Sequence, residues 1–285
     1  PPTRRAVAVT DTVHASVHNA LHLLGLNDVV VVPTSGVCTA ADLAAAVGDR
    51  VDIGIVVASA GSTNAGLVDD LAGLADWCER SGAWLHVDAA YGGAAMLVPE
   101  CRAMFAGLGR ANSVIVDPHK WLFAPAGSCA LLYRDPQLAA TVHTQHGPYL
   151  DVLHDGEGVW NPSDYGFQLT RRASGVPLWF SLAVYGVAAH ARAVKASIDL
   201  AAYAAARIDE LPDVSLVHQP QLGVVLFRRA GWASEQWASW ARKLLVDGVA
   251  FVAPTNWKGE PVGRLVFLHP QTSRAVVDEV LATLA

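Results

Sequence analysis

The amino-acid sequence predicts an α/β protein in which a large domain with a mostly parallel sheet precedes a small α+β domain. Two observations support this fold class. Apolar strand segments alternate with helical segments through the first half of the chain, which is typical of βαβ units. After a long helical segment, the C-terminal part changes to neighbouring strands with helices between them. With 285 residues, of which 52% are hydrophobic, the chain can bury the cores that this fold needs.

The elements of the large domain follow from apolar runs and helix end signals. Thr39 with Asp42 forms a capping pattern at the start of one helix, and Gly82 after Glu79-Arg80 is a stop signal for the next. We expect strands at 6–9, 28–32, 53–58, 83–87, 113–116 and 128–133, and helices at about 14–24, 39–47, 67–81 and 100–107.

The second half begins with an irregular stretch at about 143–165, which is rich in Gly, Pro, His and Asp and longer than most connections. Loops of this length are usually functional or disordered, so we expect a mobile loop. An Ala-rich helix at about 176–211 then links the two domains, which we divide as 1–178 and 179–285. In the small domain we expect strands at 213–217, 222–229, 249–252 and 263–268, and helices at 233–246 and 272–284.

Composition excludes some classes of function. The net charge of −6 and the lack of a Lys/Arg cluster argue against a nucleic-acid partner. The longest apolar stretches are too short to span a bilayer, so we expect no membrane partner. No signal peptide is apparent, and the four cysteines form no Cys-x-x-Cys pair, so we expect free thiols and a cytoplasmic location. These are Cys38, Cys78, Cys101 and Cys129.

Asp88 and Lys120 each follow the end of an apolar strand segment. Taken singly, a carboxylate or a lysine at such a place is explained by a cap or by a solvated surface charge. Open α/β sheets, however, bind ligands beyond the carboxyl ends of their strands. Pyridoxal chemistry needs a lysine amine to hold the aldehyde as a Schiff base, and a carboxylate to keep the pyridine nitrogen protonated. The two residues together can supply these groups.

Two runs carry a resemblance to a known family: His86-Val87-Asp88-Ala89-Ala90-Tyr91-Gly92-Gly93 and Asp117-Pro118-His119-Lys120-Trp121-Leu122. They resemble the group II pyridoxal-dependent decarboxylases, which include aromatic L-amino-acid, histidine and glutamate decarboxylases. The resemblance extends from about Thr10 to the C-terminus. It implies the aspartate aminotransferase-like fold (fold type I), pyridoxal 5′-phosphate as cofactor, a homodimer, and conversion of an L-amino acid to an amine and carbon dioxide. Lys120 would bind the cofactor and Asp88 its ring nitrogen.

The resemblance also implies roles for other residues around the cofactor. Ala90 would touch one face of the ring, and His14 would stack on the other face and take part in proton transfer. Thr63, and less well Ser62, matches the hydroxyl residue near the cofactor and the substrate. His119 matches the residue that contacts the phosphate.

Each of these roles has a competing interpretation. Ala90 is also explained by packing, and 61–66 by an ordinary turn before a helix. His14, His18 and His22 recur every four residues, but no Glu or Cys completes a recognisable metal set, so we expect no metal site. Asp117 stands where relatives can have a donor to phosphate, and its role stays open because a carboxylate cannot donate.

Tyr149 lies in the irregular stretch and resembles the loop tyrosine that protonates the α-carbon after carbon dioxide leaves. It favours simple decarboxylation over an aldehyde-forming relative on the same scaffold. The residues around Ala90 and Lys120 favour an aromatic substrate. The chain starts Pro1-Pro2 without the family's N-terminal arm and phosphate-binding segment, so a non-catalytic fragment is the remaining alternative.

Overall fold

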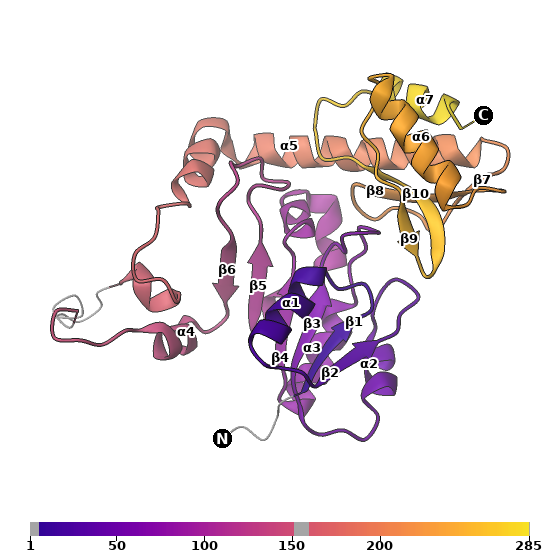
Figure 1. Ribbon diagram of the computed structural model, residues 1–285. Coiled ribbons are helices and arrows are strands. Elements are labelled where there is room, and N and C mark those ends of the chain that lie inside the picture. The colour runs from indigo at the N-terminus through magenta and orange to yellow at the C-terminus, as the bar shows by residue number, and fades with distance from the viewer. Residues whose placement is uncertain (1–5, 151–159, 285) are drawn as a thin grey trace.

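The structure is a computed structural model that describes residues 6–150 and 160–284. It contains a larger sheet formed by the first half of the chain and a smaller sheet formed by the C-terminal part, and the long helix α5 runs from one to the other (Figure 1). Measured against the described residues, no helix is both long and apolar enough to cross a membrane.

The larger sheet has six strands in the order β2-β1-β3-β4-β5-β6. All neighbouring pairs are parallel except β5 and β6, which are antiparallel. This confirms the predicted mostly parallel sheet. The strands are β1 Ala6–Thr10, β2 Val29–Val32, β3 Ile53–Ser59, β4 Trp84–Asp88, β5 Ser113–Val116 and β6 Ala130–Tyr133.

The crossover helices are α1 (Ala15–Leu23), α2 (Ala40–Val47) and α3 (Leu71–Ser81). The predicted cap of α2 is present: the backbone N–H of Asp42 donates to Thr39 Oγ1 at 3.2 Å, and the Thr39 N–H donates to Asp42 Oδ2 at 2.9 Å. Gly82 ends α3 with φ of 72°, a conformation that glycine adopts without steric cost.

Two details of this region differ from the prediction. The expected α-helix at 100–107 is a series of 3₁₀ turns, η1 Gly92–Leu97, η2 Pro99–Phe105 and η3 Leu108–Arg110. A helix that was not predicted, α4, covers Pro136–His143. Its start signal is local: Asp135 Oδ1 accepts the Gln137 N–H at 3.1 Å, and Pro136 occupies the first turn, where a missing N–H has no cost.

After the short turn η5 (Pro162–Tyr165), helix α5 extends over Val176–Asp209. It bends at Gly186, whose φ of 75° and ψ of 158° are not helical. Beyond the bend, α5 buries Val194 against the larger sheet's core and Leu200, Ala204 and Ile208 in the core of the smaller unit. The proposed domain division at 178/179 falls within the first turn of this helix.

The smaller sheet is fully antiparallel, with the order β7-β8-β10-β9. Helices α6 (Ser234–Val246) and α7 (Arg274–Ala282) contribute to its core, in which Trp237 packs edge-on against Phe227. The strand predicted at 249–252 is wrong, because the N–H groups of Val249 and Ala250 donate to Leu244 O at the end of α6. The strands are β7 Val214–Leu216, β8 Val224–Arg229, β9 Thr255–Trp257 and β10 Glu260–Val266.

Candidate active site

The candidate site lies at the carboxyl edge of the larger sheet, where β3, β4 and β5 end next to one another. Asp88 at the end of β4 pairs in register with Ser59 on β3 and with Ile115 on β5. Open parallel sheets bind ligands at this edge. Side chains from three strands and from the loops that follow them therefore face one space.

Asp88 is half-buried and belongs to one face of β4 together with Trp84 and His86. Asp88 Oδ1 accepts the N–H of Ala90 at 3.1 Å, which fixes the carboxylate beside the small residue that follows it. Below it on the same face, His86 Nδ1 lies 2.8 Å from Ser113 Oγ, and burial lowers the pKa of His86. Desolvation therefore favours a neutral imidazole beneath the carboxylate.

Lys120 lies in the turn that follows β5. Its Nζ is 2.9 Å from Asp117 Oδ2, with 36% of the lysine side chain exposed and 16% of the aspartate. The backbone fixes this pair, because the Asp117 N–H donates to Ala90 O and the Lys120 N–H donates to Asp117 O. The Asp117 carboxylate is thus the ion-pair partner of Lys120.

Tyr91 in the Asp88 segment and Trp121 in the Lys120 turn pack against each other. Tyr91, which follows Ala90, stacks on Trp121 with ring centroids 4.7 Å apart and an interplanar angle of 21°. Trp121 is fully buried next to Lys120. The Tyr91 Oη also accepts the Gly223 N–H at 2.9 Å, and burial raises the pKa of this phenol. The stack therefore connects the segment that follows Asp88 with the turn that contains Lys120.

The loop after β3 presents two hydroxyl residues to the same space. Ser62 is buried, and its Oγ accepts the Leu67 N–H at 3.3 Å, so this hydroxyl stabilises the turn itself. Thr63 is exposed at the rim. Gly61, with φ of 105°, packs so closely against Gly92 that a Cβ there would lie 2.9 Å from the Gly92 Cα. Both Ser62 and Thr63 line the cavity, and the preference for Thr63 stays a prediction.

His14 caps helix α1 at the entrance. Its Nδ1 accepts the Ser16 N–H at 3.3 Å and lies 2.7 Å from Ser16 Oγ, which orients the ring. His18 and His22 are exposed on the same helix. Within residues 6–150 and 160–284, no group of three or more His, Cys, Asp or Glu side chains could hold a metal ion.

The structure brings five of the predicted site residues together around one cavity of about 260 Å³. These are His14, Thr63, Asp88, Ala90 and Lys120. The other residues that line the cavity are Ser16, Ser59, Gly61, Ser62, Tyr91, Ile115 and Asp117.

Two predicted residues do not line this cavity. Tyr149, in the connection that follows α4, is 74% exposed. His119 is exposed beside Lys120, and its Nδ1 lies 3.4 Å from Ser128 O. Part of the mobile loop predicted at 143–165, residues 151–159, lies outside the described residues.

The chemistry of the cavity fits pyridoxal phosphate. A carboxylate, Asp88, and a primary amine, Lys120, line the same cavity, together with the small side chain of Ala90. The hydroxyl of Thr63 can donate to a phosphate. The volume lies near the lower end of small-ligand sites.

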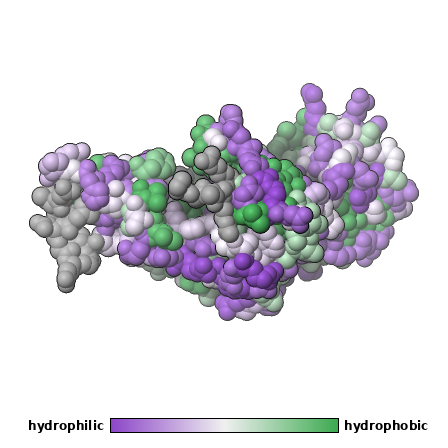
Figure 2. Space-filling model, turned by 90° about the horizontal axis from the view of Figure 1, so that it is seen from below, coloured by the Kyte–Doolittle hydropathy of each residue, from purple (hydrophilic) through white to green (hydrophobic). Residues whose placement is uncertain are grey.

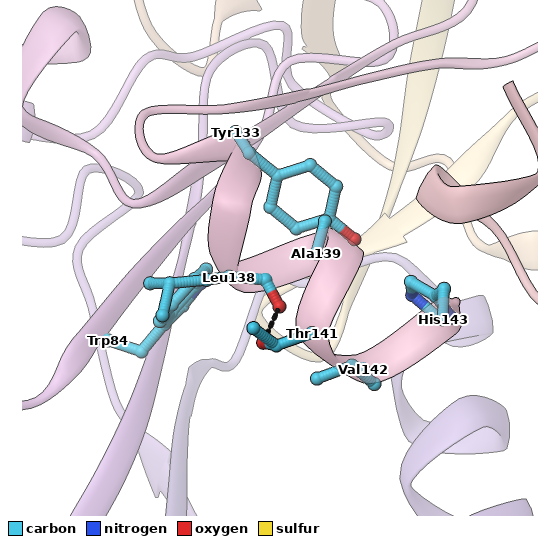
Figure 3. A pocket seen from close by; sticks show the side chains of 7 residues that line it. All are labelled: Trp84, Tyr133, Leu138, Ala139, Thr141, Val142 and His143. Atoms are coloured by element: carbon cyan, nitrogen blue, oxygen red, sulfur yellow. Dashed lines mark hydrogen bonds between the residues drawn. The ribbon is translucent and has the colours of Figure 1, made fainter. Parts of the chain in front are cut away.

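A second cavity, of about 310 Å³, lies between β4, β6 and α4 (Figure 3). Trp84 and Tyr133 mark the opposite edge of the sheet from Asp88, because Trp84 begins a parallel strand and Tyr133 ends the antiparallel one. Leu138 and Val142 from α4 make its lining largely apolar. Among the residues that the structure describes, no lysine or carboxylate lines it, so it lacks the groups that the first cavity brings together.

Sequence reasoning missed three features of the site. It gave no role to the Tyr91–Trp121 stack, to Ser59, or to the ion pair between Asp117 and Lys120. The three-residue spacing of the last pair was a usable signal, because a turn brings such residues together. The ring stack depends on how two distant loops meet, and no local pattern indicates it.

Comparisons with known proteins agree with this geometry. The profile of the family described as "Pyridoxal-dependent decarboxylase conserved domain" matches residues 3–230. An aromatic-L-amino-acid decarboxylase of Bacillus atrophaeus is 36% identical over 226 residues, which are 76% of this chain and 47% of that protein. A phenylacetaldehyde synthase of Petunia hybrida is 35% identical over 144 residues, 50% of this chain and 28% of that protein.

Among solved structures, Oryza sativa TDC with PLP and tryptamine superposes with a TM-score of 0.91 at 25% identity, covering 99% of this chain and 62% of that one. The chain thus spans about half the length of the bacterial relative and less than two thirds of the rice protein. The profile match covers most of the chain, and the fold is that of fold-type I pyridoxal enzymes. This chain therefore belongs to the family of pyridoxal-dependent decarboxylases, whose cofactor is pyridoxal phosphate.

Proposed function

We propose that this chain decarboxylates an L-amino acid to its amine and carbon dioxide, with an aromatic amino acid as substrate. The observation that supports the proposal is the presence of Asp88 and Lys120 in one cavity at the carboxyl edge of the sheet. If Asp88 and Lys120 had only structural roles, their carboxylate and amine, which come from separate elements, would not need to face the same cavity. The bacterial aromatic-L-amino-acid decarboxylase supports the choice of substrate.

Each of the two residues has a definite task in this proposal. When bound, pyridoxal phosphate supplies an electron-accepting ring that stabilises negative charge at the α-carbon. Lys120 would hold the cofactor through its aldehyde carbon, with release of water, and for this its amine would leave the ion pair with Asp117 and give up its proton. Asp88 would keep the ring nitrogen of the cofactor protonated, because a nearby carboxylate favours the charged form of that nitrogen.

Other residues of the cavity position the ring and move protons. Ala90 and His14 lie on the walls of the cavity, where a small residue and an imidazole can hold a ring between them. Tyr149 delivers a proton to the α-carbon, and in this proposal it does so in the cavity of a second subunit, because in its own chain it is exposed outside the cavity. His119, next to Lys120, would contact the phosphate, although it does not line the cavity in this structure.

The same scaffold supports a second candidate, aldehyde formation. The phenylacetaldehyde synthase among the relatives favours it, and the position of Tyr149 outside the cavity leaves the proton donor to be tested. Product analysis with an aromatic amino acid distinguishes the two, since an amine indicates decarboxylation and an aldehyde with ammonia indicates the alternative.

The proposed homodimer has support in the surface of α5. Large apolar side chains before the bend are exposed, among them Trp179 at 66%, Phe180 at 61% and Tyr185 at 69%. Figure 2 shows that hydrophobic groups also reach the surface between hydrophilic ones on the face seen from below. Exposed apolar surface of this kind marks interaction sites, and a second copy of the chain is the partner that the proposal names.

Borohydride reduction after addition of pyridoxal phosphate tests the proposal. We expect the cofactor to become fixed to the peptide that contains Lys120. The other lysines are internal controls: Lys195, Lys243 and Lys258. Labelling at one of these instead of Lys120 would refute the assignment, and absence of any binding would favour a non-catalytic fragment. Lys120→Arg should abolish turnover, because a guanidinium stays protonated and cannot act as the nucleophile.

A further inference from the structure

Arg264 on β10 is a half-buried arginine whose guanidinium is directed at backbone carbonyls. Its Nη2 donates to Thr63 O at 2.7 Å and its Nε donates to Asn64 O at 3.3 Å. Within the described part of the chain, no carboxylate forms an ion pair with it. Burial lowers its pKa, so the charge is held in a place that disfavours it. The two carbonyls are what compensates this charge.

Both carbonyls belong to the loop that forms one wall of the candidate active site. The internal hydrogen bonds of this loop lie at its base. There the Gly61 and Ser62 N–H groups donate to Leu67 O, and the Gly66 N–H donates to Ser62 O. The tip at Thr63 and Asn64 is exposed. Its contacts with the rest of the molecule come from the smaller sheet, since Thr255 Oγ1 on β9 also donates to Asn64 Oδ1 at 3.3 Å.

The same β9–β10 hairpin reaches the other loop at the entrance of the cavity. Lys258 in its turn, with φ of 50°, places Nζ 2.6 Å from Asp11 Oδ2 and 3.4 Å from Thr34 Oγ1. Asp11 follows β1 and leads to His14. In Figure 1 the hairpin points from the smaller sheet toward the upper end of β1 and β3. The Lys258 contact with Asp11 is half-exposed and therefore screened by salt.

We infer that Arg264 is a positioning residue of the active site: from outside the cavity it holds the Thr63 and Asn64 tip where the cofactor wall requires it. The inference rests on the proposed function in that the cavity is taken as the cofactor site. It assigns to the C-terminal sheet a specific task, the orientation of a cofactor loop in the other sheet. Arginine suits this task because its planar fork can donate to two carbonyls at once, which a lysine cannot do in the same geometry.

The test compares Arg264→Met with Arg228→Met in the whole chain. Arg228 is a matched control, because it belongs to the same sheet but its Nε donates to Glu260, at 2.9 Å, and not to a cavity loop. Hydrogen–deuterium exchange of the peptide covering 60–68 is the first measurement. Loss of charge-assisted bonds should speed exchange of the Gly61, Ser62 and Gly66 amides about tenfold in Arg264→Met and leave it unchanged in Arg228→Met.

The second measurement is the dissociation constant of pyridoxal phosphate, which should rise about tenfold in Arg264→Met for the same reason. Arg264→Lys should restore part of the affinity, and it replaces the Met variant if that variant does not fold. Unchanged exchange in the loop overturns the inference, as does faster exchange with unchanged affinity. If the unsubstituted chain binds no cofactor, the proposed function fails, while the exchange measurement still decides whether Arg264 holds the loop.

Discussion

Asp88 is the carboxylate on which the proposed chemistry depends most directly. Its position next to the Ala90 N–H is fixed by β4, and asparagine would fit the same space. Asp88→Asn should therefore leave the fold intact while removing the charge that keeps the ring nitrogen protonated. We expect the turnover number to fall roughly a thousandfold, which corresponds to about 4 kcal/mol in the barrier.

The measurement is the rate of amine formation with saturating cofactor, together with the cofactor dissociation constant. Asp135→Asn is the matched control, because Asp135 is an exposed cap residue of α4 outside the cavity. Near-normal turnover in Asp88→Asn would exclude this residue as the partner of the ring nitrogen.

Asp69 illustrates a buried carboxylate that affects stability. It is 3% exposed and accepts the N–H groups of Cys38, at 2.8 Å, and Ser59, at 2.7 Å. Burial raises its pKa from 3.8 to about 6 despite these bonds. Between these pH values the unfolded chain loses its proton before the folded chain does, so stability falls as the pH rises. The loss is complete above about pH 6 and amounts to about 3 kcal/mol.

Asp69→Asn should remove this dependence, since an amide does not titrate here. Urea denaturation of both proteins from about pH 4 to about pH 7 measures it, and the difference in unfolding free energy should shift in favour of the variant by that amount. The amide also loses one N–H partner, which adds an offset that does not change with pH. Parallel curves for the two proteins would contradict the assignment.

Tyr149 is the residue that decides between the two candidate reactions. If its phenol protonates the α-carbon, Tyr149→Phe should keep the binding of cofactor and substrate but leave that carbon open to dissolved oxygen. Aldehyde and ammonia should then replace the amine. Trp160→Phe is the control, because Trp160 is 69% exposed beyond the same connection. Amine at the unchanged rate from Tyr149→Phe would make Tyr149 an ordinary loop residue.

At the scale of elements, the turn after β3 depends on backbone packing that only glycine permits. Gly61→Ala would combine a φ of 105° with a Cβ 2.9 Å from the Gly92 backbone, whereas Gly25→Ala has a φ of 69° and open space around it. We expect Gly25→Ala to cost about 1–2 kcal/mol of stability and Gly61→Ala about 3 kcal/mol or more. Urea denaturation of both variants checks this, and equal losses would mean that the close approach to Gly92 relaxes freely.

How far the elements could be predicted depended on whether their signals are local. The parallel strands and α2 were predictable, because apolar runs and the Thr39–Asp42 cap lie within a few residues. The segment 249–252 has the composition of a strand, but its N–H groups bind Leu244 O, and only the end of α6 determines this. In the candidate site, too, the features with local signals were the predictable ones. The edge that joins Asp88 and Lys120 was predictable from strand ends, while the Arg264 contact spans 200 residues of sequence.

At the scale of the whole molecule, the exposed start of α5 predicts self-association. Replacing Trp179 and Phe180 together with serine should shift the chain toward the monomer in sedimentation velocity, because it removes apolar surface that a second copy would cover. Val51→Ser, at an 85% exposed position in the connection before β3, should not change the distribution. A chain that sediments as a monomer at all concentrations would contradict the proposed homodimer.

The register of β4 determines where residues can be inserted into or deleted from this chain. Trp84, His86 and Asp88 share one face of the strand, and Leu85 and Val87 are buried on the other. A single inserted or deleted residue within β4 would exchange the two faces and turn the Asp88 carboxylate into the apolar core. The exposed turn at 125–127, between β5 and β6, has no such constraint. Insertions and deletions should therefore be tolerated at that turn and not within β4, even where substitutions in β4 are tolerated.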